Sequence, residues 1–330
     1  MLLFAFSLTL VLAAAVVGLA ATAKRASRRE ALCASGFLLP SLVYLGLFLA
    51  APLAFSLYMA FHKWSIDAGA GSNPWVGLEN FSSVFTGARS PYFWRALLNT
   101  ALYTFLHVPA SLAIALGVAI ILNHLGRSRR FLQTIFFLPN LCLLAAVAVV
   151  WRWMYNPEIG LFNGLLRAFG VDARIGWLTS PKLIGGVLPL PLLSIVVMAI
   201  WMSFGVQAVI YLAGLRSIPQ TYYDAARVDG ANRWQTFRHV TIPLLKPTTL
   251  FLLVTSVIAS FQVFTSIYVM VDETLLATHR ADVLVYQIYD YAWISERNLG
   301  LASALSWILF LIVLSVTIVQ FRLVGREVNY

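Results

Sequence analysis

The chain has 330 residues, of which 60% are hydrophobic and only 11% are charged. An ordinary soluble domain is roughly 45–50% apolar, so this composition excludes that class and indicates a polytopic membrane protein. The net charge of +10 does not indicate nucleic-acid binding, because the basic residues are spread over connections between apolar runs instead of gathering on one soluble domain. Orientation in the membrane and contact with anionic lipid account for them better.

Seven apolar runs are long enough to cross a bilayer, whose hydrocarbon core of about 30 Å requires about 20 residues of helix. They lack the residue-by-residue alternation of a membrane β-barrel. Backbone groups in lipid must also pair within their own segment, which favours helices. We therefore predict an all-α bundle with spanning helices at 2–22, 33–61, 97–123, 131–155, 183–215, 248–271 and 299–324.

Lysine and arginine are concentrated in alternate connections, at 24–29, 127–130, 216–246 and 322–326. The other connections are longer and carry fewer basic residues. Because basic loops stay in the cytoplasm, the first set is predicted to lie inside. This places the N-terminus outside and the C-terminus in the cytoplasm.

The first apolar run has two interpretations. Ala21-Thr22-Ala23 fits the cleavage pattern of a secretory signal. However, the run has no basic segment before it and is longer than the roughly 7–15 apolar residues of a signal core. We expect residues 1–32 to be retained as an additional membrane helix with a basic cytoplasmic loop, ahead of one membrane domain at 33–330.

Cysteine and histidine do not indicate a metal centre. Cys33 and Cys142 lie in apolar runs without a CxxC partner. The histidines have no ligand spacing such as HxxxH; they are His62, His107, His124, His239 and His279. We expect no metal site and no cofactor in this chain.

A polar segment at 216–247 interrupts the apolar runs. Pro219 suits the first turn of a helix, and Ala225 and Ala226 are strong helix formers with little bulk. Gly230 can take the positive φ that ends a helix, and a second short helix is predicted at 232–240. The segment therefore reads as a helix, a bend and a helix. The residues alone leave two roles open, a docking element for another protein or an amphipathic helix at the lipid surface.

Several motifs stand out along the chain: Asp224-Ala225-Ala226, Asp229-Gly230-Ala231, Phe237, Ile242-Pro243, Pro247, Val76 to Phe81, Phe93 to Thr100 and Trp151 to Asn163. Together they resemble the permease subunits of carbohydrate ABC importers of the maltose and sn-glycerol-3-phosphate type. Asp224 replaces the glutamate usual at its position in that family, and the chain lacks the family's glycine-rich turn after Met270.

This resemblance implies the six-helix core of a type I ABC importer and a place in the bacterial inner membrane. It implies a second homologous permease, two ATPase subunits that bind ATP and Mg²⁺, an extracytoplasmic solute-binding protein and membrane lipid as partners. The chain contains no GxxxxGK[ST] loop and is not expected to be an enzyme itself. The residues implied to dock on the ATPase are Asp224, Ala225, Ala226, Asp229 and Gly230.

Polar side chains inside spanning helices are costly unless they face the bundle or a wet cavity, so they are candidates for the substrate path. Aromatic faces suit the apolar sides of sugar rings. The candidates are Ser203, Phe204, Gln207, Gln262, Phe264, Thr265, Ser266 and Tyr268. Helix–helix packing remains open for each of them, and the resemblance favours Ser203 and Gln262.

The predicted substrate is a sugar, most simply an oligosaccharide such as maltose or a maltodextrin. A polyol or glycerol phosphate is an alternative within the same family. Two alternatives come from other classes, a membrane glycosyltransferase using Asp272 and Glu273 and a secondary sugar carrier. Neither explains the segment from Asp224 to Gly230.

Overall fold

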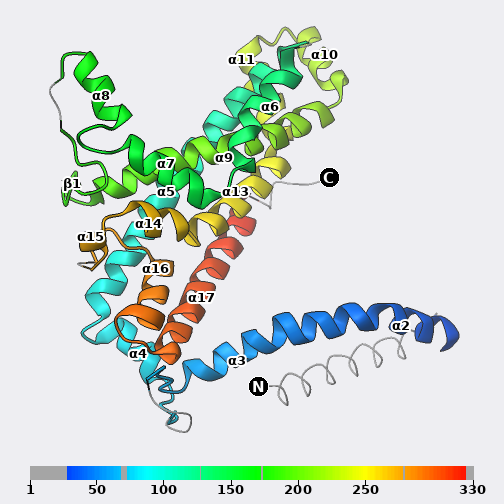
Figure 1. Cartoon of the computed structure of the whole chain (residues 1–330). Coiled ribbons are helices and arrows are strands. Elements are labelled where there is room, and N and C mark those ends of the chain that lie inside the picture. The colour runs from blue at the N-terminus through cyan, green and yellow to red at the C-terminus, as the bar shows by residue number, and fades with distance from the viewer. Residues whose placement is uncertain (1–27, 68–72, 127, 172–173, 278, 325–330) are drawn as a thin grey trace. The chain divides into compact units, whose positions relative to one another are not determined.

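The computed structural model describes residues 28–67, 73–126, 128–171, 174–277 and 279–324 (Figure 1). They fall into two compact units, one within Met1–Gly87 and Ile288–Ile308, the other within Ala88–Gln287 and Leu309–Tyr330. The predicted run at 2–22 lies outside the described residues. The additional helix and the domain boundary after residue 32 therefore stay predictions.

The first unit is built on a long helical rod. Asn80 fixes the chain that leaves this rod, because its side-chain amide donates to the carbonyls of Ala60 at 2.9 Å and His62 at 3.0 Å. Gly300 packs directly on the same carbonyl of His62, where a Cβ atom would overlap it. The elements are α2 (Arg28–Leu45), the π-helix η1 (Gly46–Ala50), α3 (Ala51–Ala60), α4 (Glu79–Thr86), the π-helix η3 (Asp290–Ile294) and the start of α17 (Leu299–Val324).

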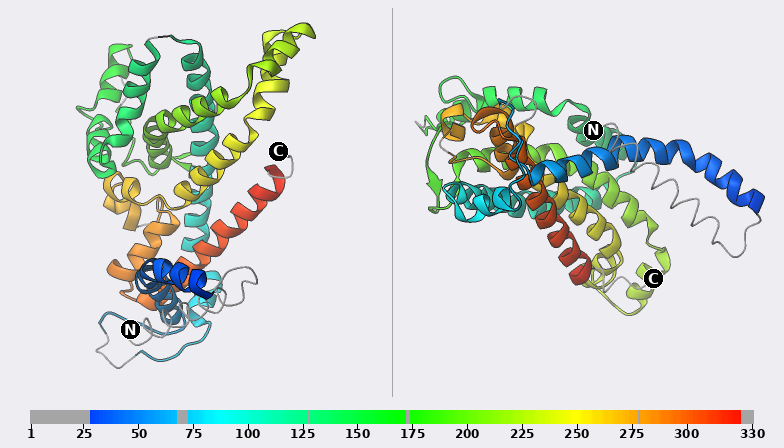
Figure 2. Two further views of the ribbon diagram at one scale, coloured as in Figure 1. Left: turned by 90° about the vertical axis from the view of Figure 1, so that its right-hand side faces the viewer. Right: turned by 90° about the horizontal axis from the view of Figure 1, so that it is seen from below.

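The second unit is a helical bundle in which α5 packs along α9, α6 packs on α9, and α13 packs on α5 (Figures 1 and 2). Its elements are α5 (Ser90–His124), α6 (Ser128–Leu141), α7 (Leu144–Met154), α8 (Leu161–Ala168), β1 (Leu183–Ile184), β2 (Leu188–Pro189), α9 (Leu190–Ser217), α10 (Gln220–Val228), α11 (Arg233–Thr236), the π-helix η2 (Phe237–Thr241), α12 (Ile242–Leu244), α13 (Lys246–Phe261), α14 (Thr265–Met270), α15 (Glu273–Ala277) and most of α16 (Leu284–Tyr289).

Within the described residues, four helices are long and apolar enough to cross a membrane, or up to six if each of two bent helix pairs is one span. Five of these match the predicted runs 33–61, 97–123, 131–155, 183–215 and 299–324. The bent pair Arg233–Leu244 with Lys246–Phe261 covers only the first part of the predicted run 248–271. The helical fold is therefore confirmed over this part of the chain, with one exception. Residues 183–189 form a small antiparallel hairpin, which pairs Leu183 with Pro189 and turns at Gly185 and Gly186, both with positive φ.

Two predicted continuous helices are wrong. The run 131–155 bends by 94° between α6 and α7, where Leu143 has an extended backbone after Pro139. The run 248–271 stops at Phe261 and resumes as α14 at Thr265. Apolar length identified both runs, but it carries no information about a local break in the helix, since the broken residues are themselves largely apolar.

Candidate functional site

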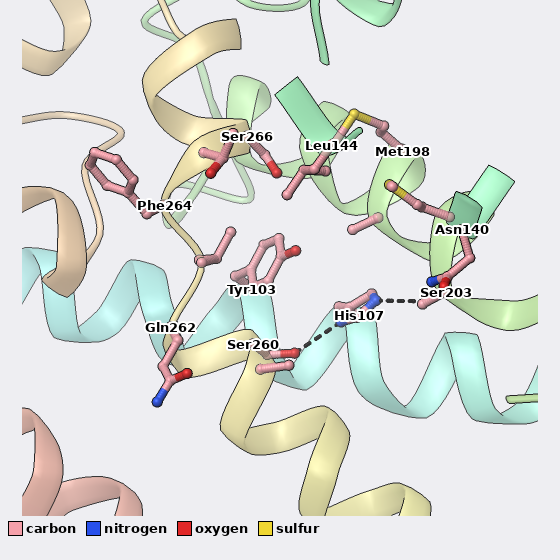
Figure 3. Close-up of a pocket in the computed structure, with 15 residues that line it drawn as sticks. Tyr103, His107, Asn140, Leu144, Met198, Ser203, Ser260, Gln262, Phe264 and Ser266 are labelled. Carbon is pink, nitrogen blue, oxygen red and sulfur yellow. Dashed lines mark hydrogen bonds between the residues drawn. The ribbon is translucent and has the colours of Figure 1, made fainter. Parts of the chain in front are cut away.

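A cavity of about 360 Å³ lies inside the second unit (Figure 3). This is within the roughly 300–1,000 Å³ typical of small-molecule sites. It is bordered by residues of α5, α9 and α13 and by both helix breaks. The lining residues are Tyr103, His107, Asn140, Leu144, Met198, Ala199, Met202, Ser203, Ala259, Ser260, Gln262, Val263, Phe264, Thr265 and Ser266.

Both broken spans reach this cavity at their breaks. Asn140 and Leu144 flank the first break, and residues 262–266 contain the second. A break frees backbone carbonyl and N–H groups from the helical ladder. At membrane depth such a backbone is tolerated only where it is buried in protein or lines a water-filled space. The breaks therefore place polar backbone groups at the cavity inside an otherwise apolar bundle.

His107 joins three helices at the cavity wall. Its Nδ1 lies 2.9 Å from Ser260 Oγ on α13, and its Nε2 lies 3.0 Å from Ser203 Oγ on α9 (Figure 3). The imidazole is buried, and the ring of Tyr103 stacks on it with centroids 5.5 Å apart. Each ring nitrogen is therefore held by a serine hydroxyl on a different helix.

The structure brings five of the eight candidate path residues to the cavity: Ser203, Gln262, Phe264, Thr265 and Ser266. In Figure 3 the Gln262 amide and the Phe264 ring point away from His107. The other three candidates do not line the cavity.

Each of these three packs against a neighbouring side chain. Gln207 is buried, and its amide donates to Ser256 Oγ at 3.1 Å between α9 and α13. Phe204 packs edge-on against Phe136, and Tyr268 stacks on Phe264. The sequence left a packing role open for these residues, and the structure shows packing contacts for all three.

The polar segment forms a helix, a bend and a helix, as predicted. α10 ends before Gly230, which has φ +75°. The second helical stretch starts at a capping box, in which Asn232 accepts from the Gln235 backbone at 2.9 Å and the Gln235 side chain accepts from the Asn232 backbone at 2.8 Å. It continues through η2 and α12 to Leu244, beyond the predicted end at residue 240.

Four of the five predicted docking residues, Asp224, Ala225, Asp229 and Gly230, are exposed, and Ala226 is buried against the bundle. Val228, which the sequence did not single out, is 88% exposed on the same helix. Arg227 Nη1 lies 3.2 Å from Asp224 Oδ1, and both side chains of this ion pair are exposed to solvent. α10 thus presents a small exposed face with apolar residues and charges of both signs, at the end of α9 opposite the hairpin (Figure 1).

The sequence that forms the broken spans, the cavity and the exposed helix–bend–helix matches a known protein family. The family described as "binding-protein-dependent transport system inner membrane component" matches residues 79–327. The chain belongs to this family. The resemblance stated from the motifs is confirmed, and the protein is an inner-membrane permease of the sugar ABC importer type.

Individual relatives cover nearly the whole permease. It is 32% identical over 314 residues to the probable ABC transporter permease protein YesP of Bacillus subtilis, covering 93% of this chain and 94% of that one. It is 31% identical over 300 residues to the trehalose/maltose transport system permease protein MalF of Thermococcus litoralis, covering 90% and 95%. A crystal structure of a bacterial ABC transporter involved in import of the acidic polysaccharide alginate matches with TM-score 0.76 at 26% identity, covering 91% and 98%. These similarities set aside the glycosyltransferase and the secondary carrier.

Sequence reasoning missed Tyr103, His107, Asn140 and Ser260 at the permease cavity. His107 was considered only as a metal ligand, although an ionisable residue inside a span is by default a candidate for function. Asn140 follows Pro139, and an amide beside a proline in an apolar run is a signal for a break at a polar site. Tyr103 and Ser260 carry no such signal, because single hydroxyls are common in packed helices.

Arg152 connects the two segments that follow the breaks. Its Nη1 donates to the carbonyl of Val269 at 3.1 Å, in the last turn of α14, where carbonyls lack helical partners. Asp272 lies beyond this helix end, and its hydrogen bonds from Thr274 hold the pKa of the Asp272 carboxyl below its usual range, with Arg152 adding to the effect. Arg152 therefore caps α14 from α7.

Replacing Arg152 by methionine is expected to loosen α14. A hydrogen bond of this kind contributes on the order of 1 kcal/mol, so amide exchange across Thr265–Met270 should accelerate by about two- to tenfold. Hydrogen exchange followed by mass spectrometry on the solubilised permease measures this. Arg167→Met is the matched control, because Arg167 also donates to a backbone carbonyl, that of Glu158 at 2.7 Å, but away from α14. Unchanged exchange in Arg152→Met would contradict the cap.

Proposed function

We propose that this permease pairs with a second homologous permease to form the path for an oligosaccharide such as maltose or a maltodextrin. Two separate ATPase subunits bind ATP and Mg²⁺, dock on α10 and drive the transport. An extracytoplasmic binding protein delivers the sugar. The observation that carries the proposal is the polar cavity between two broken spans, in the same bundle that presents the exposed α10.

The chemistry of the cavity supports a sugar. Hydroxyls of Ser203, Ser260 and Thr265 and the amide of Asn140 offer hydrogen bonds to sugar hydroxyl groups. The ring of Tyr103 offers an aromatic surface for the apolar face of a pyranose. The cavity of about 360 Å³ is small for an oligosaccharide, which supports a path completed by a second permease.

The charge distribution supports an orientation in which α10 faces the cytoplasm. Basic residues lie within α10 and directly after it, including Arg227, Arg233 and Arg238. By the same rule we propose a cytoplasmic C-terminus and an N-terminus outside. An ATPase on the cytoplasmic side would then bind α10, while sugar enters from the outer side of the membrane.

The test is reconstitution of the permease with its partner permease, ATPase and binding protein in proteoliposomes. Uptake of radiolabelled maltotriose and ATP hydrolysis are measured together. We expect maltotriose to raise ATP hydrolysis severalfold only when the binding protein is present, and uptake to require ATP. Uptake without ATP, or ATP hydrolysis indifferent to every sugar and polyol offered, would refute the proposal. Sorbitol and sn-glycerol 3-phosphate in the same assay cover the polyol and glycerol phosphate alternatives.

A further inference from the structure

The hydrogen bonds of His107 fix the direction in which each neighbouring hydroxyl points. Ser203 Oγ lies 3.4 Å from the carbonyl of Ile200, an acceptor to which a helical serine hydroxyl donates. Because its hydrogen is directed at Ile200, Ser203 Oγ is left to accept from His107 Nε2, which lies 3.0 Å away, so the network assigns the proton of the neutral ring to Nε2. Nε2–H then donates to Ser203.

The second serine follows from this assignment. With its proton on Nε2, the neutral imidazole leaves Nδ1 as an acceptor. Ser260 Oγ, at 2.9 Å, must therefore donate its hydrogen to Nδ1. The hydrogens of both serines are then used within the protein, that of Ser203 by Ile200 and that of Ser260 by His107. Both serine oxygens therefore face the cavity with lone pairs, as hydrogen-bond acceptors.

Two fixed acceptors discriminate between classes of sugar. A hydroxyl group of a neutral sugar can donate to either oxygen. A carboxylate, phosphate or sulfonate has no hydrogen to donate, and it meets lone pairs where it needs charge-assisted donors. Among the described residues that line the cavity there is also no lysine, arginine, aspartate or glutamate. An anion would leave water without a compensating charge on this wall, which is costly.

We propose that this permease selects uncharged, polyhydroxylated sugars over anionic ones, with Ser203 and Ser260 accepting from substrate hydroxyls and His107 as the positioning residue that orients them. The inference rests on the proposed function and deepens it. It separates this chain from its relative whose transporter imports the acidic polysaccharide alginate, although the two share a fold. It also disfavours glycerol phosphate as the substrate.

The experiment measures binding to the complete detergent-purified transporter, both permeases with the ATPase, without the binding protein, whose own selectivity would mask the cavity. Radiolabelled maltotriose is the probe, and maltotriose and a trisaccharide of uronic acids of the same size compete with it. In the wild type we expect the uronic acid trisaccharide to compete at least about tenfold more weakly. In His107→Ala both serine hydroxyls can rotate, so maltotriose should bind about tenfold more weakly and the preference for the neutral sugar should shrink.

Controls separate selectivity from folding. Ser111→Ala removes a buried hydroxyl one turn further along α5, which donates to Val108 away from the cavity, and should leave both affinities unchanged. If His107→Ala does not assemble, Ser203→Ala removes one acceptor while His107 keeps its hydrogen bond to Ser260, and it should weaken maltotriose binding alone. Equal or tighter binding of the uronic acid trisaccharide by the wild type, or an unchanged preference in the variants, would overturn the inference. Because the uptake assay scores sugar-stimulated ATP hydrolysis separately, failure of the importer function would be recognised there.

Discussion

Replacing Ala225 by arginine is expected to lower sugar-stimulated ATP hydrolysis by at least tenfold while the permease stays folded in the membrane. Ala225 is exposed on α10 beside Asp224 and Val228, so the bundle itself does not contact the new side chain. Arginine is also a good helix former, which preserves α10. A partner that approaches the small alanine closely would instead have to bury a long, unpaired charge, and this costs several kcal/mol.

The measurement is co-purification of the ATPase with the permease, followed by ATP hydrolysis with and without sugar. Ala168→Arg is the matched control, because Ala168 is an exposed alanine on another helix, α8. We expect Ala168→Arg to behave as the wild type. If Ala225→Arg co-purifies and hydrolyses ATP normally, α10 is not the docking element. The alternative of an amphipathic surface helix, with Trp234 and Phe237 in the lipid boundary, would then be favoured.

Replacing Gly205 by alanine is expected to deplete the folded permease from the membrane. Gly205 lies on α9 where α6 crosses it, and a Cβ atom there would overlap the backbone carbonyl of Phe136. Backbone cannot rotate away as a side chain can, so the two helices must separate. Such overpacking costs about 1–3 kcal/mol or more, and small residues at helix crossings in membranes exist to permit this approach.

Size-exclusion chromatography of the solubilised permease, followed by thermal unfolding, gives the folded fraction. Gly117→Ala is the control, since a Cβ atom on α5 at this position meets nothing within 4 Å. Alanine is the better helix former, so Gly117→Ala should be neutral or slightly stabilising. Equal yields and unfolding temperatures for the two variants would show that α6 and α9 do not require this close approach.

The separation of α6 from α9 would also reach the cavity. α6 carries Asn140 at its end, and α9 carries Ser203 two residues before Gly205. We therefore expect any folded Gly205→Ala permease to bind sugar more weakly as well. The glycine was not singled out from the sequence, because no pattern of one chain indicates which glycine faces a neighbouring helix.

Sequence alone was enough to assign the class of this permease, its long apolar runs and its exposed helix–bend–helix segment. Each of these is encoded locally. Membrane spans follow from runs of about 20 apolar residues. The bend at Gly230 and the helix before it follow from proline, alanine and glycine at neighbouring positions, and the structure confirms them.

Which polar residues meet could be seen only once the helices were packed. Ser203 and Ser260 lie 96 and 153 residues along the chain from His107, and the three become one network only when α5, α9 and α13 pack together. The helix breaks at the cavity were not predicted from the sequence, because apolar residues occur both in intact helices and in broken turns. Gln207 shows the converse: its amide nitrogen donates to Ser256 between helices and it does not line the cavity, although its residue type suggested the substrate path. Hydrogen-bond partners are set by packing between helices, and residue type alone does not specify that packing.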